Sequence, residues 1–452
     1  MTQSGEGSFE PGKDKEEENK KKKKVKVRIS LFFDGTLNNR ANVRAGVDSQ
    51  AYKDAKSEKG WTNPFDIKNS LWGVGSYENA LSNVAKMEEH VKANASEYID
   101  SIYIEGQGTS DLEADSFSGK ALGLSETGVT QRAKKGVDET LDSIKELLIK
   151  LEAENTVIEK LSIDVFGFSR GAAAARNFLH IVMSSRSRGR IPERNLKSKV
   201  ESLLGFEVES VEVEFAGLYD TVSSVGPPMV HKWNSRQLSL DAISHAKEVV
   251  HLVAADEHRE NFSLTNTKSA GSKEIYLPGV HSDIGGGYRD KFDENGLVIF
   301  KGNQKQVEAE FKRLVENGWV DQEQLSQVAP PGYRGKVETI NWKLELRERI
   351  VRNEYDRIPL HIMAEFAREA GINVSVDLEE DYEIEDSLLV EMFPKFKSYA
   401  KKRNSKLDDW LGNKEPWEGL RKKFFHMSAH YSATGMAPRF VNGKRKRLVY
   451  EG

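Results

Sequence analysis

The chain has 452 residues, with 67 Lys and Arg against 71 Asp and Glu and a formal net charge of −4. This balance gives no overall attraction to nucleic acid or to anionic membranes, so no nucleic-acid partner is expected. The chain contains no cysteine, which excludes disulfides, thiolate metal ligands and cysteine nucleophiles. No uninterrupted apolar run is long enough to span a bilayer. At this length we expect one large unit with sizeable insertions.

The first 24 residues are rich in Gly, Glu and Lys and end in the run Lys20–Lys24. Such a segment buries too little apolar area to offset its ordering entropy, so residues 1–24 are predicted to be a disordered tail. The segment also lacks the apolar core of a secretory signal peptide. Export would therefore need a route that does not read such a signal.

Ordered structure is expected to begin with a strand at Val25–Phe33, where the sequence alternates and then becomes continuously apolar. An amphipathic helix is expected at Thr130–Glu154, since its apolar residues recur at three- and four-residue steps. Strands that alternate with helices predict an α/β fold with a mainly parallel central sheet flanked by helices. The further strand candidates are Ser101–Glu105, Leu161–Phe166, Val211–Leu218 and Glu274–Leu277.

The domain organisation follows from these elements. Residues 25–290 are predicted to form the core, with an insertion at about 40–100 that is too long for a simple crossover. Residues 291–452 are predicted to form a helical cap or accessory region, with a C-terminal segment that returns to the core. Helical patterns there include Val307–Glu316 and Asp386–Lys402, and Pro394 is expected to kink or divide the second.

The strongest local motif is Gly167-Phe168-Ser169-Arg170-Gly171. It follows the predicted strand at Leu161–Phe166 and precedes an alanine-rich helix former, which is the context of a nucleophile elbow. Its glycines permit the sharp turn that would raise the serine hydroxyl above the sheet. Ser169 is therefore the candidate nucleophile of a serine hydrolase of the α/β-hydrolase type.

A hydrolase of this type needs an acid and then a histidine, each after a later strand. Asp220 follows the strand candidate Val211–Leu218 and is the leading acid. His281 lies on a glycine-rich loop just beyond Glu274–Leu277 and is the leading base. The rival acids are Asp256 and Asp283, the second of which is expected to stabilise its own loop. The rival histidines are His426 and His430, whereas His251 and His258 are placed in a probable helix.

The oxyanion hole is expected to use the backbone N–H of Arg170, the residue after the nucleophile. A second donor is predicted at Gly35 or Thr36, on the loop after the first strand, although a turn with an Asx cap is the alternative there. An aspartate-nucleophile phosphatase is excluded because Phe32 occupies the nucleophile position. The sequence has no P-loop, and His281-Ser282-Asp283 lacks partners at zinc-site spacing, so neither a cofactor nor a metal is expected.

Five motifs in this order make the chain resemble the GxSxG-containing phospholipase effectors of the bacterial type VI secretion system. The resemblance spans roughly residues 25–290, with weaker similarity near Phe425–Ser432. The family's serine, aspartate and histidine match Ser169, Asp220 and His281. The motifs are Phe32–Asn39, Tyr103–Thr109, Gly167–Gly171, Gly217–Val222 and Pro278–Tyr288.

The resemblance implies a phospholipase A that acts on membrane glycerophospholipids of a rival bacterium. It implies synthesis in the bacterial cytoplasm, delivery by the type VI machinery, and action at the periplasmic face of the target membrane. A spike-type carrier and a cognate immunity protein would be its partners.

Two alternatives stay open: a soluble carboxylesterase or thioesterase with the same triad, and a non-catalytic secretion-associated binding module. Aromatic and leucine residues near 410–425 could anchor the protein at a membrane interface or pack against the core. These are Trp410, Leu411, Trp417, Leu420, Phe424 and Phe425.

Overall fold

The computed structural model describes most of the chain. Residues 1–21 of the predicted tail lie outside the described part. The described residues are 22–58, 75–113, 115, 127–150, 156–184, 195–225, 232–233, 238–272, 274–331, 341–403, 405–406, 409, 417–432 and 436–452.

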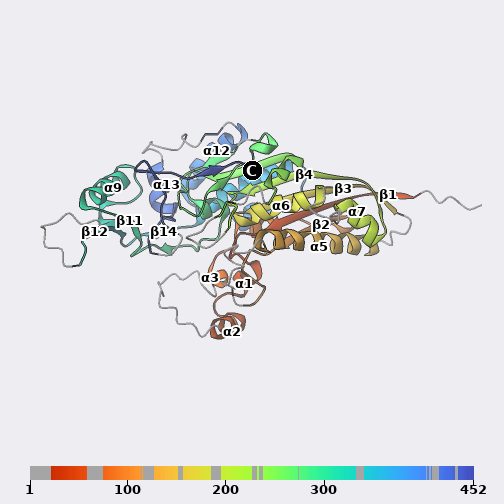
Figure 1. Ribbon diagram of the computed structural model, residues 1–452, viewed down its shortest axis with the longest axis horizontal. Coiled ribbons are helices and arrows are strands. Elements are labelled where there is room, and N and C mark those ends of the chain that lie inside the picture. Colours follow the sequence, from red (N-terminus) through yellow and green to blue (C-terminus); the bar gives the residue numbers. More distant parts are fainter. Residues whose placement is uncertain are drawn as a thin grey trace, which may run out of the picture.

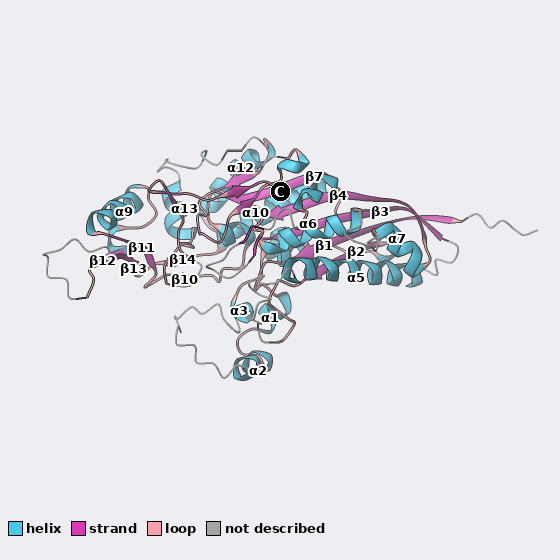
Figure 2. Cartoon of the chain, in the orientation of Figure 1, coloured by secondary structure: helices cyan, strands magenta, loops and turns pink. Residues whose placement is uncertain are grey.

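A six-stranded sheet forms the centre of the molecule, and every strand pairing in it is parallel. This arrangement confirms the predicted α/β-hydrolase-like class (Figure 2). The first strand begins at Lys23, so the last two lysines of the predicted tail belong to the sheet. In spatial order the strands are β2 (Ile99–Ile104), β1 (Lys23–Phe33), β3 (Thr156–Phe168), β4 (Glu207–Tyr219), β7 (Ala246–Ala254) and β9 (Ile275–Leu277).

Helices cover both faces of this sheet. On one face, α5 (Thr127–Lys150) and α6 (Arg170–Met183) lie side by side (Figure 1). On the other face, α4 (Asn83–Glu88) and α10 (Arg357–Glu369) contact the strands. Because side chains alternate along a strand, Leu31 and Phe33 pack into the first core, whereas Phe32 packs into the second.

The prediction was wrong for the segment around His251, which was placed in a helix. The residue lies in β7, a buried strand whose Leu252 pairs with Ile275 of β9. The sequence around it is a continuous apolar run with several valines, and such short runs suit a buried strand as well as a buried helix.

The region beyond residue 290 contains the predicted helices as α9 (Gln304–Glu316) and α12 (Ser387–Lys401). Pro394 lies inside α12 and does not divide it. Besides these helices the region contains an antiparallel three-stranded sheet, which was not expected from the sequence. Its strands are β11 (Val298–Gly302), β13 (Trp342–Leu346) and β12 (Leu325–Val328).

These accessory elements lie beyond the carboxyl ends of the central strands, the edge at which parallel sheets place their sites (Figure 1). The insertion between β1 and β2 begins with α1 (Arg40–Ala45), α2 (Gln50–Glu58) and α3 (Gly75–Glu78), which stand away from the sheet. Near the end of the chain, β17 (Val449–Tyr450) pairs with β8 (Leu264–Thr265).

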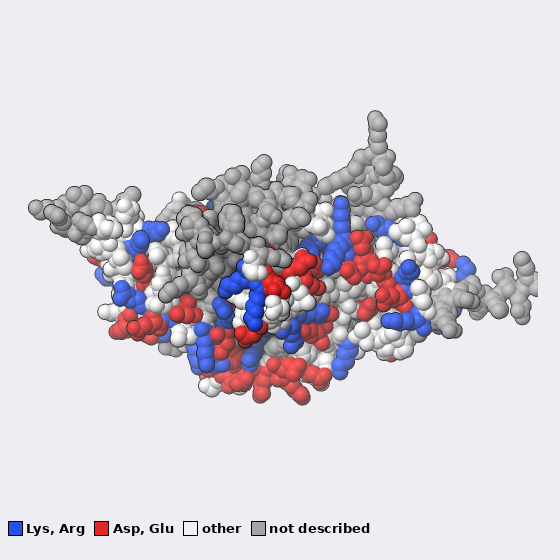
Figure 3. Space-filling view, turned by 90° about the horizontal axis from the view of Figure 1, so that it is seen from below, with Lys and Arg blue, Asp and Glu red and all other residues white. Residues whose placement is uncertain are grey.

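The suggested membrane anchor is wrong for the residues whose side chains are described. Leu420, Phe424 and Phe425 are fully buried, the first two in α13 (Trp417–Phe424) and the third just after it. Trp410, Leu411 and the side chain of Trp417 lie outside the described part. Acidic and basic side chains are interspersed on the described surface in Figure 3. No described helix is both long and apolar enough to cross a membrane.

We predict that Gly171→Ala destabilises the fold, because a Cβ at this glycine would lie 2.2 Å from the carbonyl oxygen of Phe33. The clash is with backbone, so the expected loss in the free energy of unfolding is about 2 kcal/mol or more. Urea denaturation measures it. Gly205→Asn is the matched control, because Gly205 has open space around it and asparagine tolerates its positive φ of 77°. Equal midpoints for the two variants would contradict the prediction.

Candidate active site

Ser169 occupies the sharp turn between β3 and α6. Its φ of 57° and ψ of −125° lie in a region that non-glycine residues rarely adopt. Such strain costs about 1–3 kcal/mol and persists only where the surroundings enforce it. The turn brings α6 so close to β3 that a Cβ at Gly167 would lie 2.5 Å from the Cα of Ala172. The predicted strand–turn–helix context of Ser169 is therefore present.

Backbone hydrogen bonds tie this turn to the end of β4. The Ser169 N–H donates to the Tyr219 carbonyl at 3.0 Å, and the Val222 N–H donates to the Ser169 carbonyl at 3.2 Å. Asp220, which follows Tyr219, is thus held close to the serine by the sheet itself.

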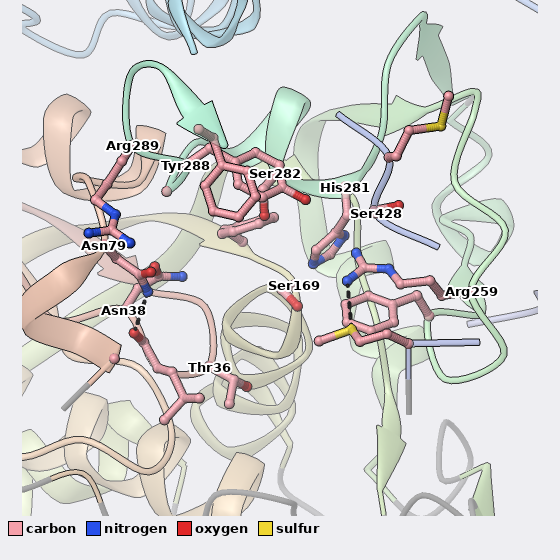
Figure 4. A pocket seen from close by; sticks show the side chains of 18 of the residues that line it. Thr36, Asn38, Asn79, Ser169, Arg259, His281, Ser282, Tyr288, Arg289 and Ser428 are labelled. Atoms are coloured by element: carbon pink, nitrogen blue, oxygen red, sulfur yellow. Dashed lines mark hydrogen bonds between the residues drawn. The ribbon is translucent and has the colours of Figure 1, made fainter. Parts of the chain in front are cut away.

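Asp220 and His281 form a direct pair. The Nδ1 atom of His281 lies 2.5 Å from Oδ2 of Asp220, and the carboxylate is fully buried. Because a carboxylate accepts hydrogen bonds, Nδ1 carries the proton and Nε2 is left as the acceptor. Both His281 and Ser169 line one cavity, where the serine hydroxyl lies beside the imidazole (Figure 4).

Two further groups bind Asp220. The Ala254 N–H, at the end of β7, donates to Oδ1 at 3.0 Å. The guanidinium of Arg447 binds both oxygens, with Nη1–Oδ1 at 2.6 Å and Nη2–Oδ2 at 2.8 Å. Sequence reasoning missed Arg447, because it lies in the basic stretch Lys444–Arg447, which has the composition of a solvated surface. No local motif distinguishes it from its neighbours.

The pKa values follow from these contacts. Burial alone would raise the pKa of Asp220, but the Arg447 charge and the His281 hydrogen bond outweigh it and hold that pKa far below its usual range. Burial lowers the pKa of His281, although the hydrogen bond and charge of Asp220 oppose this. At neutral pH the pair therefore consists of an ionised carboxylate and a neutral imidazole, which is the state that can accept a proton.

A second buried ion pair supports His281 from its backbone side. Glu257 binds Arg259 through both carboxylate oxygens, at 2.7 and 3.1 Å. The His281 N–H donates to Oε2 of Glu257 at 3.3 Å. No sequence motif predicted this ion pair either.

The cavity that contains Ser169 has a volume of about 240 Å³. Apolar side chains from the core and from the accessory region line much of it, including Phe168, Phe262 and Leu297. Arg289 lies at one side beside Asn79 (Figure 4). The site is thus a mainly apolar hollow with a few polar groups near Ser169, as in small-molecule sites generally.

The predicted oxyanion donors differ in their surroundings. Arg170 begins α6, and Thr36 lines the cavity. The Gly35 N–H donates to Oδ1 of its neighbour Asp34 at 2.7 Å and is therefore already used. Thr36 is thus the better candidate of the two for the second donor.

The rival acids and histidines have other partners or lowered basicity. Oδ2 of Asp283 accepts from the Val280 N–H at 2.8 Å, and Oδ1 lies 2.6 Å from Nδ1 of His426, so Asp283 stabilises its own loop. Asp256 accepts from the Gly279 N–H at 2.8 Å, and burial raises its pKa to about 6. His430 lines the cavity, but burial lowers its pKa to about 4. None of these contacts of Asp256 and Asp283 involves Ser169.

Residues 183–306 match the model of the type VI secretion system phospholipase effector Tle1-like catalytic domain. The chain resembles this family. The matched segment contains Asp220 and His281 and begins 14 residues after Ser169. No curated protein matches the chain.

Two solved structures are similar to it. The Tle1 effector, in its structure bound to the VgrG spike of the type 6 secretion system, is 22% identical, with a TM-score of 0.62, and the match covers 96% of this chain and 95% of that one. This likeness supports the same fold. An uncharacterized protein from Pseudomonas aeruginosa is 19% identical, with a TM-score of 0.47, over 86% of this chain and 52% of that one.

We predict that the His281 imidazole titrates below 6.5, the ordinary histidine value, because its burial disfavours the charged form. A histidine with a lowered pKa is neutral above that pKa and becomes charged only as the pH falls through it. NMR titration of isotope-labelled histidine measures this, with His281→Gln used to assign the resonance. A midpoint at or above 6.5 would show that Asp220 dominates over burial.

Proposed function

We propose that the protein hydrolyses acyl ester bonds of membrane glycerophospholipids through Ser169, His281 and Asp220. The observation that carries this proposal is the 2.5 Å contact between His281 and the buried Asp220, together with the cavity that His281 and the strained Ser169 both line. A nucleophile, a base and an orienting acid in this relation are the parts of a serine hydrolase.

In the proposed reaction the Ser169 oxygen attacks the ester carbonyl carbon while Nε2 of His281 takes the hydroxyl proton. The tetrahedral oxyanion accepts hydrogen bonds from the N–H groups of Arg170 and Thr36. As the intermediate collapses, the leaving alcohol oxygen receives the proton from His281. Water then attacks the acyl-enzyme and gives its proton to His281, which returns it to Ser169 as the fatty acid leaves. The chemistry uses no cofactor.

Asp220 fixes the imidazole with Nε2 toward the serine and stabilises the transient imidazolium. It serves this role because its carboxyl group stays ionised over the whole range in which the histidine titrates, as its strongly lowered pKa requires. The lowered pKa of His281 keeps the base neutral and ready before each cycle.

The lipid substrate is supported by the match of residues 183–306 to the Tle1-like phospholipase effectors. On the same basis we propose an antibacterial effector of the phospholipase A type. We propose that the type VI machinery delivers it on a spike-type carrier, since the similar Tle1 effector is bound to the VgrG spike in its own structure. A cognate immunity protein in the producing cell and action at the periplasmic face of the target membrane complete this proposal.

The test is fatty-acid release from phosphatidylethanolamine and phosphatidylglycerol vesicles by the purified protein and by Ser169→Ala. We expect the substitution to lower the rate by roughly 10³-fold or more, because the nucleophile is lost while the rest of the cavity is kept. Ser162→Ala, a substitution of a buried serine earlier in β3, is the matched control and should keep the activity.

The other outcomes separate the alternatives. Ser169-dependent cleavage of a soluble short-chain ester or thioester, without release from vesicles, would replace the phospholipase with a soluble esterase or thioesterase. No hydrolysis of any of these substrates would leave a non-catalytic binding module and would sink the proposal.

A further inference from the structure

We propose that Arg447 is a positioning residue of the active site, which holds Asp220 in one orientation and balances its charge against His281. The inference rests on the proposed function for its catalytic meaning. It adds a fourth residue to the three that sequence reasoning identified, brought from 227 positions away in the chain.

The guanidinium of Arg447 fixes the orientation of the Asp220 carboxylate. It donates one hydrogen bond to each carboxylate oxygen, and two such bonds fix the plane of a carboxylate, whereas a single bond does not. Its Nε–H donates to the Phe262 carbonyl at 2.7 Å. The Phe262 ring packs edge-on against His281, with ring centroids 5.0 Å apart. One guanidinium therefore contacts the acid and also holds the loop that packs against the base.

Backbone hydrogen bonds on both sides of strand β8 hold Arg447 close to Asp220. Arg447 is 8% exposed and lies just before β17, which pairs in parallel with β8. The Leu264 N–H of β8 donates to the Leu448 carbonyl at 2.9 Å, and the Thr265 N–H donates to the Thr221 carbonyl at 3.0 Å. Strand β8 thus joins Leu448, the neighbour of Arg447, to Thr221, the neighbour of Asp220. A backbone ladder on this short path sets the distance between the two charges.

Arg447 also compensates the negative charge that Asp220 places beside His281. A bare carboxylate beside an imidazole stabilises the imidazolium and so makes the base hold its proton more tightly. Arg447 compensates part of the Asp220 charge, which keeps the histidine neutral while leaving the acid ionised. The charged and titratable groups around the pair are Arg447, Glu257, Arg259, His251 and Tyr276. Glu257 and Arg259 neutralise one another, so Arg447 is the cation that faces Asp220 directly.

Charge compensation by Arg447 predicts a change in the pH–rate profile that loss of packing does not predict. If Arg447 is neutralised, Asp220 attracts the proton on His281 more strongly, and the acid limb of the pH–rate profile moves to higher pH. If a substitution merely loosens the Asp220–His281 contact, the imidazolium loses stabilisation and the acid limb stays or moves to lower pH. The two explanations therefore predict opposite signs.

The experiment compares Arg447→Gln, Arg447→Lys and wild type by ester hydrolysis from pH 4 to 9. We expect Arg447→Gln to lower kcat by about tenfold or more and to raise the acid-limb midpoint by about one pH unit. Arg447→Lys keeps the positive charge but loses the two-point hydrogen bonding of the guanidinium. In this variant kcat should therefore fall less, while the acid-limb midpoint stays near that of wild type. KM should change little, because Arg447 does not line the cavity.

Arg445→Gln is the matched control. Arg445 lies two residues away and is partly buried, but it binds Glu310 at 2.7 Å and the Ile299 carbonyl at 3.1 Å. Its removal should cost stability without moving the acid limb. Thermal unfolding of all variants shows whether each is folded, and if Arg447→Gln does not fold, Arg447→Lys decides. Wild-type kcat in Arg447→Lys, or a midpoint shifted in it, would overturn the inference.

NMR titration of His281 in the same variants needs no substrate. The midpoint should rise in Arg447→Gln and stay near wild type in Arg447→Lys. An unchanged or lowered midpoint in a folded Arg447→Gln would overturn the inference. If wild type hydrolyses no ester, the proposed function fails, whereas this titration still decides whether Arg447 sets the charge state of the pair.

Discussion

Complete burial of the Asp220 carboxylate is the constraint around which the site is organised. A buried charge is tolerated only when other groups replace the water that it loses. Here the replacements come from three places in the sequence: the Ala254 N–H at the end of β7, His281 after β9, and Arg447 before β17. Each partner satisfies part of the carboxylate, and together they fix its orientation. The need to compensate one charge therefore brings distant segments to the same edge of the sheet.

The parallel sheet explains why these segments can meet. Its strands all end at one edge, so residues that follow β3, β4, β7 and β9 become neighbours although they are far apart in the sequence. The hydrogen bond from the Ser169 N–H to the Tyr219 carbonyl shows how close the first two ends lie. Beyond this edge the accessory region closes one side of the cavity, with residues such as Leu297 and Met427. The core supplies the candidate reactive groups, and the later segments add apolar residues to the cavity wall.

Sequence patterns predicted the parts that depend on local signals. The strand before Ser169 and the glycines beside it are readable because a sharp turn and close helix packing require small residues. Asp220 and His281 became candidates because each follows a strand pattern. The strand that contains His251 was missed, since a short apolar run has no periodicity that separates strand from helix. Arg447 and the Glu257–Arg259 pair could not be found, because their significance lies in burial by contacts distant in sequence, which composition alone does not reveal.

The segment that matches the family model contains only part of the site. Residues 183–306 include Asp220 and His281, together with Glu257 and Arg259, whereas Ser169 and Arg447 lie on either side of that segment. Within the segment Glu257 and Arg259 pair with one another, whereas both oxygens of Asp220 bind Arg447 from outside it. The segment therefore holds the Asp220–His281 pair without the cation that balances the Asp220 charge. Its charge balance depends on the ladder between β8 and β17, so the stability of that ladder and the protonation of His281 should be thermodynamically linked.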